Sequence, residues 1–527
     1  MNALELILIL LVVAAALAVA AERLKIPYPI LLVVGGLGLA FIPGLPAVKI
    51  NPELVLLLFL PPLLFAAAWF TSWRDFAAAR RPISLLAIGL VVVTTTAVAW
   101  VAHAVIPGMG WPVAFVLGAI VSPPDAVAAT AVTQRLKVPR RIVTILEGES
   151  LVNDATGLVA YRFALAAVAT GSFSPTHAAG RFALVAAGGV AVGLVVGWLV
   201  AQIHRRMEDF QLETVITLLT PYAAYIPAEH LGVSGVLATV AAGGYLGWRN
   251  PELLSALTRF RGRGVWSVLL LLFNGLVFIL IGLQLASIRA ISTGVPWKSL
   301  LGYAAAVSGV AIVARLVYVP IGAYLPFLLS RKLRERERAP RWQSVALIGW
   351  TGMRGIVSLA LALALPLSLP SGEPFPQRAL VVVLSFAVIL VTLVMQGLTL
   401  PALIRAFGLK DDGASLREER EALLHASEAA VKRLAELDQT SIINPQLLER
   451  VRMPYEERLE RLSEQSRDDP ECRLTEGENA AFHRLRTEAI AAERKAVVEL
   501  RNQGRISEEV LHQVQEALDL EALQPDR

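Results

Sequence analysis

Acidic side chains within apolar stretches are the first candidates for chemistry in this sequence. Asp125 lies within one such stretch, and Glu147, Glu149 and Asp154 lie in the next, all within thirty residues of one another. An ionised side chain at the centre of a bilayer costs several kcal/mol, so residues of this kind are functional candidates by default. The group predicts a site that handles charge inside a membrane.

Two of these carboxylates are predicted to lie at the same depth. At about 1.5 Å per residue, Asp125 lies about 20 Å from the outer end of its helix and Asp154 about 16 Å from the inner end of the next. In a hydrocarbon core about 30 Å thick, both are near the midplane. Asn153 adds a neutral amide beside Asp154, and Ser150 precedes Asp154 by one turn on the same helix face. Consecutive antiparallel helices would therefore bring these groups together.

The helix that carries Asp125 is predicted to break beside it. Pro123 and Pro124 remove two backbone donors and clash with the preceding turn. Carbonyls freed at membrane depth are tolerated only where they line a cavity or meet other protein groups. Unwound, oxygen-rich backbone beside carboxylates suits a hard monovalent cation, whereas a kink that serves only packing is the alternative.

A second break is predicted in Gly349–Ser358, where two glycines flank Arg354. The two interrupted spans are seven apart in order and run in opposite directions, which indicates an inverted-repeat transporter with its site at the crossing. A buried guanidinium demands a carboxylate, and depth favours Glu149 as the partner of Arg354. Arg315, the other deep arginine, is interpreted as structural, and Arg162 is expected to snorkel to the membrane surface.

The elements that must position these residues are membrane-spanning helices. The 527 residues have 55% hydrophobic and 17% charged side chains, with a mean hydropathy of +0.60. Soluble domains carry about 25% charged residues. The composition excludes a secreted disulfide scaffold, a disordered chain and a nucleic-acid binder, and the lone Cys472 indicates a reducing compartment. Apolar stretches predict thirteen spans, near 3–21, 28–43, 52–70, 83–106, 112–134, 143–170, 180–203, 212–228, 233–247, 265–288, 298–328, 343–369 and 378–406.

Basic residues in the loops predict the orientation of these spans. Loops after odd-numbered spans carry 21 Lys and Arg residues, and loops after even-numbered spans carry 5. Because Lys and Arg are retained on the cytoplasmic side, the N-terminus is predicted outside and the C-terminal tail in the cytoplasm.

The tail differs in character from the rest of the chain. Residues 407–527 carry 18 basic and 27 acidic side chains, a net charge of −9, against +14 for residues 1–406. Interleaved opposite charges with leucines at helical spacing predict short amphipathic helices. We therefore expect an all-α protein with a membrane domain, 1–406, and an acidic helical cytosolic tail, 407–527. The tail either packs on itself or a partner subunit, or binds a regulatory ligand.

The chain resembles the monovalent cation:proton antiporter-1 family, the sodium/proton exchangers, particularly its bacterial branch. The resemblance rests on three segments: Ser122-Pro-Pro-Asp-Ala-Val-Ala128, Glu147-Gly-Glu-Ser-Leu-Val-Asn-Asp154 and Gly352-Met-Arg-Gly-Ile-Val-Ser-Leu-Ala360. It implies a homodimer in which two crossed, unwound helices belong to a core domain, near 83–170 and 298–406. A scaffold and dimerisation domain would comprise the helices near 3–70 and 180–288.

The resemblance also implies roles for the site residues. Asp154 would bind the cation and the proton in turn, and Asn153 forms with it the pair typical of electroneutral exchangers. Asp125 and Ser150 would line the monovalent-cation site, and Glu149–Arg354 would form a structural ion pair. Many members have Thr immediately before the span-five Asp, where this chain has Pro124. Ser122, backbone carbonyls or water would then supply the missing ligand, and Glu147 would face the cytoplasmic funnel.

The expected function is exchange of Na⁺ or Li⁺ for H⁺ across the bacterial inner membrane, with no cofactor and with lipid as the surroundings. A K⁺/H⁺ antiporter of the same architecture is the main alternative. A cation channel or a proton-coupled carrier of an organic solute is less favoured. An intramembrane serine protease is suggested only by Gly232-Val-Ser-Gly235, since no histidine lies within another span to serve as its base. We therefore expect a transporter and not an enzyme.

Overall fold

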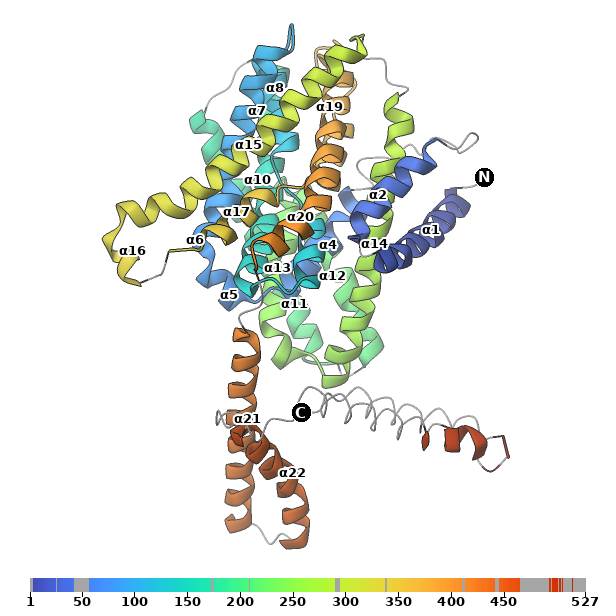
Figure 1. Ribbon diagram of the computed structural model, residues 1–527, viewed down its shortest axis with the longest axis vertical. Helices are drawn as coiled ribbons and strands as arrows, with labels where there is room; N and C mark the ends of the chain where they lie inside the picture. Colours follow the sequence, from blue (N-terminus) through green and yellow to red (C-terminus); the bar gives the residue numbers. More distant parts are fainter. Residues whose placement is uncertain are drawn as a thin grey trace. The chain divides into compact units, whose positions relative to one another are not determined.

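The computed structural model describes most of the chain as helices (Figure 1). In the described part, the only β-type pairing is a single antiparallel β-bridge between Ser368 and Pro374. The chain separates into two compact units, Met1–Asp411 and Asp412–Arg527. The described residues are 3–24, 26–41, 56–171, 175–207, 209–289, 294–336, 339–409, 413–440, 445–464, 492–493, 495–500, 502–503, 505 and 514.

Seven helices of the first unit form what we name the scaffold group. In it α14 packs against α1 and α2, and α13 packs against α4, α11 and α12. Buried aromatic and small side chains fill its centre, among them Phe65, Trp69, Ala238 and Trp266. The members are α1 (Ala3–Leu24), α2 (Tyr28–Leu39), α4 (Leu60–Phe70), α11 (Pro175–His204), α12 (Phe210–His230), α13 (Gly235–Leu253) and α14 (Ala256–Arg289).

A second set of helices, the core group, carries the two predicted breaks. Here α8 packs between α7 and α10, and α15 packs against α7, α17 and α19. The members are α6 (Arg80–Ser84), η1 (Leu85–Leu90), α7 (Val91–Val105), α8 (Trp111–Val121), α9 (Ala126–Arg135), α10 (Arg140–Thr170), α15 (Trp297–Leu329), α17 (Trp342–Trp350), α18 (Ile356–Leu363), α19 (Arg378–Val391), η2 (Thr392–Gln396) and α20 (Gly397–Ala406). Two short helices, α5 (Trp73–Ala78) and α16 (Arg331–Arg336), complete the unit.

The apolar character of these helices fits a bilayer. Among the described residues, seven helical segments are long and apolar enough to cross a membrane, for example Trp297–Leu329 and Arg378–Ala406. Each of the thirteen predicted ranges also contains helical residues. Two of the three short predicted ranges, 212–228 and 233–247, extend further in the structure, as α12 and α13, whereas the third, 28–43, contains the shorter α2.

Close approach between helices depends on glycine at a few positions. Gly36 of α2 and Gly282 of α14 face each other's backbone, and a Cβ at Gly282 would overlap the carbonyl oxygen of Val33. Small residues allow backbones to approach closely where no apolar driving force separates helix from lipid. The pair therefore sets the tight contact between α2 and α14, which lie side by side in Figure 1.

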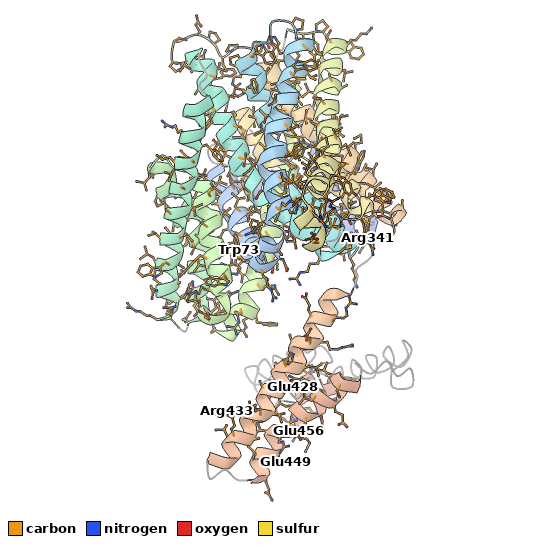
Figure 2. The ribbon with its side chains drawn as sticks, turned by 90° about the vertical axis from the view of Figure 1, so that its left-hand side faces the viewer. Trp73, Arg341, Glu428, Arg433, Glu449 and Glu456 are labelled. Atoms are coloured by element: carbon orange, nitrogen blue, oxygen red, sulfur yellow. The ribbon has the colours of Figure 1, made fainter. Side chains whose placement is uncertain are left out.

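The second unit contains the helices predicted in the tail. In it α21 (Ala414–Thr440) and α22 (Pro445–Glu464) pack against each other. Charged side chains cover both helices, including Glu428, Arg433, Glu449 and Glu456 (Figure 2). Short ion pairs within one helix, such as Arg452–Glu456 at 2.5 Å, give modest local support to the helical state. Cys472 lies outside the described residues.

Candidate functional site

The two predicted breaks cross each other in the structure. Helix α8 ends at Val121 and α9 begins at Ala126, while α17 ends at Trp350 and α18 begins at Ile356. The backbone N–H of Asp125 donates a hydrogen bond of 2.7 Å to the carbonyl of Met353. The prediction of two interrupted, crossed helices is therefore confirmed.

Glycine at position 355 allows this crossing to be tight. A Cβ added there would overlap Oδ2 of Asp125. The carboxylate of one break therefore lies directly against the backbone of the other. This contact explains why the second break contains a glycine beside Ile356.

Asp125 also begins the next helix. It is the N-cap residue of α9, and its Oδ1 accepts a hydrogen bond of 2.8 Å from the N–H of Val127. The hydroxyl oxygen of Ser150 accepts a hydrogen bond of 3.3 Å from the N–H of Ala126. The first turn of a helix carries a partial positive charge, so these contacts offset part of the cost of burying a negative charge on Asp125.

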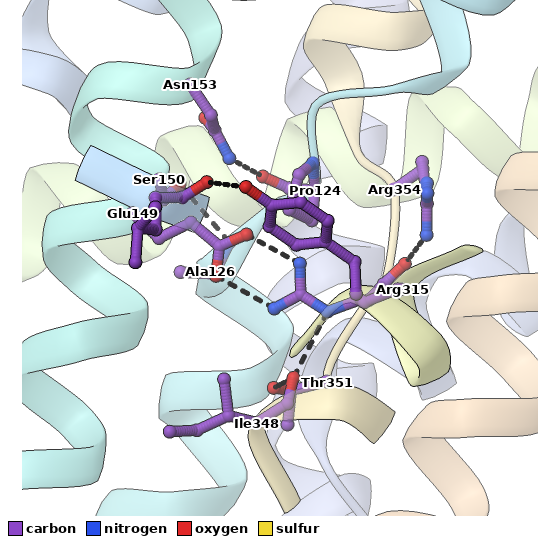
Figure 3. Close-up of polar contacts among 12 residues, drawn as sticks. Pro124, Ala126, Glu149, Ser150, Asn153, Arg315, Ile348, Thr351 and Arg354 are labelled. Carbon is purple, nitrogen blue, oxygen red and sulfur yellow. Dashed lines mark hydrogen bonds and ion pairs between the residues drawn. The ribbon is translucent and has the colours of Figure 1, made fainter. Parts of the chain in front are cut away.

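Asn153 holds the first break from the side of α10. Its Nδ2 donates a hydrogen bond of 2.9 Å to the carbonyl of Pro124, and its side chain is fully buried (Figure 3). The carbonyl belongs to the unwound backbone, which has no helical partner for it. Asn153 therefore fixes the unwound segment beside Asp154.

A cavity of about 610 Å³ collects four of the nine predicted site residues. Asp125, Glu147, Ser150 and Asp154 all line it. The cavity also reaches Asp75 and Arg140, which form an ion pair of 2.6 Å and are partly exposed. It therefore extends from the carboxylates to the surface. No described group of three or more His, Cys, Asp or Glu side chains is arranged to hold a metal ion.

Three predicted lining residues take different positions. Glu147 lines the cavity, where its Oε1 accepts a hydrogen bond of 3.3 Å from Gln134. Ser122 is buried and donates to the carbonyl of Ala119 at 3.2 Å, and Pro124 contributes its carbonyl to Asn153. Neither Ser122 nor Pro124 is among the residues that line the cavity.

Neutral polar residues of the scaffold group also line the cavity, and they were not predicted from the sequence. Tyr28 of α2 and Asn274 of α14 both line it, from different helices of the scaffold group. Asn274 interrupts a strongly apolar run, Leu269-Leu-Leu-Leu-Phe-Asn274. An isolated amide of this kind is a usable signal, but a search restricted to acidic residues does not detect it.

A second cavity touches Asp154 from another direction. It has a volume of about 290 Å³ and is lined mainly by aliphatic side chains such as Leu158 and Leu361. Arg162 and Glu229 also line it and form an ion pair of 2.8 Å between α10 and α12. The Arg162 side chain is 43% exposed, so its expected reach towards the membrane surface stays a prediction, and the ion pair with Glu229 of the scaffold group is a contact that the sequence did not predict.

The buried partner of Glu149 is Arg315 and not Arg354. Both oxygens of Glu149 accept hydrogen bonds from the Arg315 guanidinium, at 2.5 and 2.8 Å, and the two side chains are 2% and 1% exposed (Figure 3). Arg315 also donates to the carbonyl of Ile348 at 3.1 Å. The predicted pair Glu149–Arg354 is therefore wrong.

Backbone oxygens take up the guanidinium of Arg354 instead. Its Nε donates to the carbonyl of Val121 at 2.8 Å, and its Nη1 donates to the carbonyl of Gly352. Both carbonyls belong to ends of interrupted helices, where no N–H of the next turn is available. Arg354 therefore donates hydrogen bonds to carbonyls that the two helix breaks leave without a helical partner. Glu149 forms its ion pair with Arg315 of α15 instead.

The serine of Gly232-Val-Ser-Gly235 has a structural task. Ser234 is the N-cap residue of α13, and its hydroxyl oxygen accepts a hydrogen bond of 3.2 Å from the N–H of Leu237. This contact accounts for a serine at the start of a helix without any nucleophilic role.

Comparison with known families agrees with this geometry. Residues 7–406 match the family described as "Sodium/hydrogen exchanger, transmembrane". The chain belongs to this family. Its members are transporters rather than enzymes, and the assignment covers both breaks, α10 and both cavities.

Relatives from two bacteria extend the similarity into the tail. A Mycobacterium tuberculosis protein named as an uncharacterized Na⁺/H⁺ exchanger is 36% identical over 512 residues, with 96% of this chain and 93% of that protein covered. The uncharacterized Na⁺/H⁺ exchanger YjcE of Escherichia coli is 34% identical over 523 residues, with 94% and 93% covered.

A relative with a broader named ion range is also similar. The sodium, potassium, lithium and rubidium/H⁺ antiporter of Bacillus subtilis is 36% identical over 391 residues, with 72% of this chain and 58% of that protein covered. Among solved structures, the sodium proton antiporter MjNhaP1 of Methanocaldococcus jannaschii superimposes with a TM-score of 0.58 at 20% identity. This match covers 77% of this chain and 98% of that one. It supports the fold alone.

Proposed function

We propose that this protein exchanges Na⁺ or Li⁺ for H⁺ by letting the two ions compete for Asp154. The observation that carries the proposal is the position of Asp154, which lines both the 610 Å³ and the 290 Å³ cavity. Ions can reach a residue that lines two separate cavities from one side of the membrane and then from the other. This is the geometric requirement of an alternating-access carrier.

The chemistry of competition follows from a carboxylate with limited water. Desolvation disfavours a bare negative charge, so the carboxylate is stable either as the protonated acid or beside a cation. The carboxylate therefore binds either a proton or a cation, but not both at once. If only the loaded forms cross the barrier between the two faces, cation and proton fluxes are coupled.

Electroneutral exchange is supported by the neighbours of Asp154. Asn153 is neutral and is engaged with the Pro124 carbonyl. Asp125 accepts a hydrogen bond at the start of α9, where the helix end offsets part of the cost of burying its charge, and we propose that it stays ionised. Asp154 is then the only carboxylate that exchanges a bound proton for a bound cation. One H⁺ therefore replaces one Na⁺, and no net charge crosses the membrane.

The proposed motion displaces the core group against the scaffold group. Asp154 belongs to α10 of the core group, whereas Tyr28 and Asn274 on the opposite wall of the larger cavity belong to the scaffold group. Apolar side chains dominate the contact near Asp154, including Leu60, Leu151 and Val236. Such surfaces can shift without breaking many polar contacts.

K⁺/H⁺ exchange is the second candidate function. The Bacillus subtilis relative is named for sodium, potassium, lithium and rubidium. Pro124 stands where many members have a threonine, so one hydroxyl ligand that could discriminate by size is absent from that position. A larger ion would then be accommodated with water in the ligand set.

Assembly and placement follow the family resemblance and the charge pattern. We propose a homodimer in the bacterial inner membrane with the N-terminus outside and the tail in the cytoplasm. The larger cavity would then open to the cytoplasm, because Asp75 and Arg140 belong to loops predicted on that side.

The test uses purified protein in liposomes that hold a pH gradient and an internal pH dye. Na⁺, Li⁺ or K⁺ is added outside, with the membrane voltage clamped by an ionophore or left free. A dye response to Na⁺ and Li⁺ that the clamp does not change is the expected result. A response to K⁺ alone favours the second candidate, and a rate that depends on the clamp contradicts electroneutral exchange.

A further inference from the structure

Ser358 of α18 contributes a buried hydroxyl group to the wall of the 610 Å³ cavity. Its side chain is 1% exposed, and within the described part of the chain its Oγ has no hydrogen-bond partner. Ser308 and Ser385 are also buried without a partner in that part, but they line neither of the cavities that reach Asp154. A buried hydroxyl group that stays unpaired is unfavourable. Its position in a polar cavity therefore indicates that Ser358 meets a ligand there.

The second helix break explains why this hydroxyl group is unpaired. Hydroxyl groups within helices commonly donate to the carbonyl four residues earlier, as Thr156 does to Val152 at 3.1 Å. For Ser358 that carbonyl belongs to Arg354, which lies in the unwound segment before Ile356, the first residue of α18. The Ser358 hydroxyl does not bond to it. The break therefore leaves this hydroxyl group open to the cavity.

The start of α18 directs Ser358 towards the carboxylate of Asp125. Gly355 is the N-cap residue of α18, and Ser358 is the third residue of the helix. A side chain at the third position lies on the side of the N-cap residue, as it does in a capping box. A Cβ at Gly355 would overlap Oδ2 of Asp125. The Ser358 hydroxyl and the Asp125 carboxylate therefore border the same part of the cavity, with no hydrogen bond between them.

We propose that the hydroxyl oxygen of Ser358 is a ligand of the transported cation, an inference that rests on the Na⁺ or Li⁺ exchange proposed above. Na⁺ and Li⁺ are hard cations, which prefer oxygen ligands. A serine hydroxyl has two lone pairs and no charge. Ser358 therefore adds a ligand to the ion without changing the charge that Asp154 balances.

Ser358 also supplies a hydroxyl group that position 124 lacks. Ser122 donates to the carbonyl of Ala119, and the carbonyl of Pro124 accepts from Asn153. Neither Ser122 nor Pro124 lines the cavity, whereas Ser358 enters it from the opposite break. The cation would then be held by oxygens from both broken helices and from α10.

The experiment measures the KM for Na⁺ in the liposome assay at alkaline pH, where protons compete least for the carboxylate. Ser358→Ala removes one oxygen from the cation and disrupts no hydrogen bond of the described protein. The KM for Na⁺ should rise about tenfold, as expected for the loss of one contact to a charged group, and the maximal rate should stay close to that of the unaltered protein. Ser358→Thr keeps the hydroxyl group and should restore the KM.

Ser385→Ala is the matched control. It removes the same atom from a fully buried, unpaired serine of α19 that lines neither cavity, so the KM should not change. An unchanged KM in Ser358→Ala, or a raised KM that Ser358→Thr fails to restore, overturns the proposal.

A second measurement separates a cation ligand from a structural serine. In mild detergent, Na⁺ should raise the melting temperature of the full chain, because it binds the folded state. Ser358→Ala should raise the Na⁺ concentration that gives half of this effect by about tenfold and leave the melting temperature without Na⁺ unchanged. A lower melting temperature without Na⁺, together with an unchanged half-saturating concentration, assigns Ser358 a structural role and overturns the proposal.

The unaltered protein separates this inference from the proposed function. If it neither exchanges nor is stabilised by any cation, the proposed function and the ligand role of Ser358 both fail. If it exchanges Na⁺ normally and Ser358→Ala matches it in both measurements, only the role of Ser358 fails.

Discussion

The two cavities that meet at Asp154 differ sharply in their walls. The larger one carries the acidic residues Asp75, Asp125 and Glu147, together with Ser150 and the amide of Gln134. The smaller one is lined mainly by aliphatic side chains and contains the Arg162–Glu229 ion pair. One side of Asp154 can therefore solvate a cation, and the other side cannot.

This difference has a meaning for the transport cycle proposed above. A lining of acidic side chains attracts cations and raises their local concentration. An apolar lining penalises a charge that lacks water, and an ion pair across the two helix groups holds the walls together. On the alternating-access mechanism proposed above, the structure would correspond to a state that is open through the larger cavity and closed at Arg162–Glu229.

The largest effect is expected at the residue that the cavities share. Asp154→Asn removes the carboxylate for which, on the proposed mechanism, cation and proton compete, so coupled exchange should fall to the level of empty liposomes. The measurement is the response of the internal pH dye to added Na⁺, with the melting temperature as a check of folding. The control is Glu252→Gln, which also removes one negative charge but lies outside both cavities, and it should show normal exchange. Coupled transport in Asp154→Asn would defeat the assignment.

A smaller but still large effect is expected from the backbone that borders the larger cavity. Gly355→Ala places a Cβ where Oδ2 of Asp125 lies, so the carboxylate must move by about 1 Å or more, which should slow exchange by about 10- to 100-fold. Gly302→Ala in α15 meets open space and should leave the rate unchanged. Equal initial rates of exchange for Gly355→Ala and Gly302→Ala in liposomes would show that the contact between the two helix breaks tolerates an added methyl group.

A more moderate effect is expected when the ion pair beside the smaller cavity is removed. Arg162→Gln removes a partly exposed ion pair between α10 and α12, a contact worth up to about 1 kcal/mol, or about fivefold in an equilibrium. A cysteine at Leu158, introduced together with Cys472→Ser, would then react faster with an impermeant maleimide added outside. The exchanged pair Arg162→Glu with Glu229→Arg should restore slow labelling. Unchanged labelling in Arg162→Gln would contradict the role of the pair.

The smallest effect is expected from the acidic wall of the larger cavity. Glu147 precedes Asp154 by seven residues, about 10 Å along α10, where one unit charge in water is worth about 0.4 kcal/mol. Glu147→Gln should therefore raise the KM for Na⁺ about twofold and leave the maximal rate unchanged. The difference should shrink in high concentrations of a cation that is not transported. A loss of maximal rate would instead place Glu147 in the transport step itself.

Much of this arrangement could be predicted because a few residue types have strong backbone consequences. Consecutive prolines at 123 and 124 cannot continue a helix, and the structure shows α8 ending at Val121. The glycines around Arg354 mark the second interruption in the same way. Acidic residues in apolar stretches predicted much of the polar lining of the larger cavity, because an ionised group is costly in a bilayer unless it meets water, a cation or a partner.

The partner of Glu149 could not be predicted because depth does not give direction. Arg315 and Arg354 are both available to a buried carboxylate, and the rotation of each helix about its axis decides which one points toward it. The sequence also conceals the acceptors for Arg354, since the carbonyls of Val121 and Gly352 become available only through the exact ends of two helices. Uncharged polar residues that line the larger cavity, such as Tyr28 and Asn274, are hidden for a related reason, because a search for charges does not detect them.

The hydrogen bond from the amide of Asp125 to the carbonyl of Met353 has a consequence for how this family is mapped by mutation. Both partners are main-chain atoms, so replacing either side chain leaves the bond in place. An alanine scan would therefore report the carboxylate of Asp125 but remain blind to the bond that joins the two broken helices. Only an amide-to-ester replacement at Asp125 would remove that donor while leaving every side chain intact.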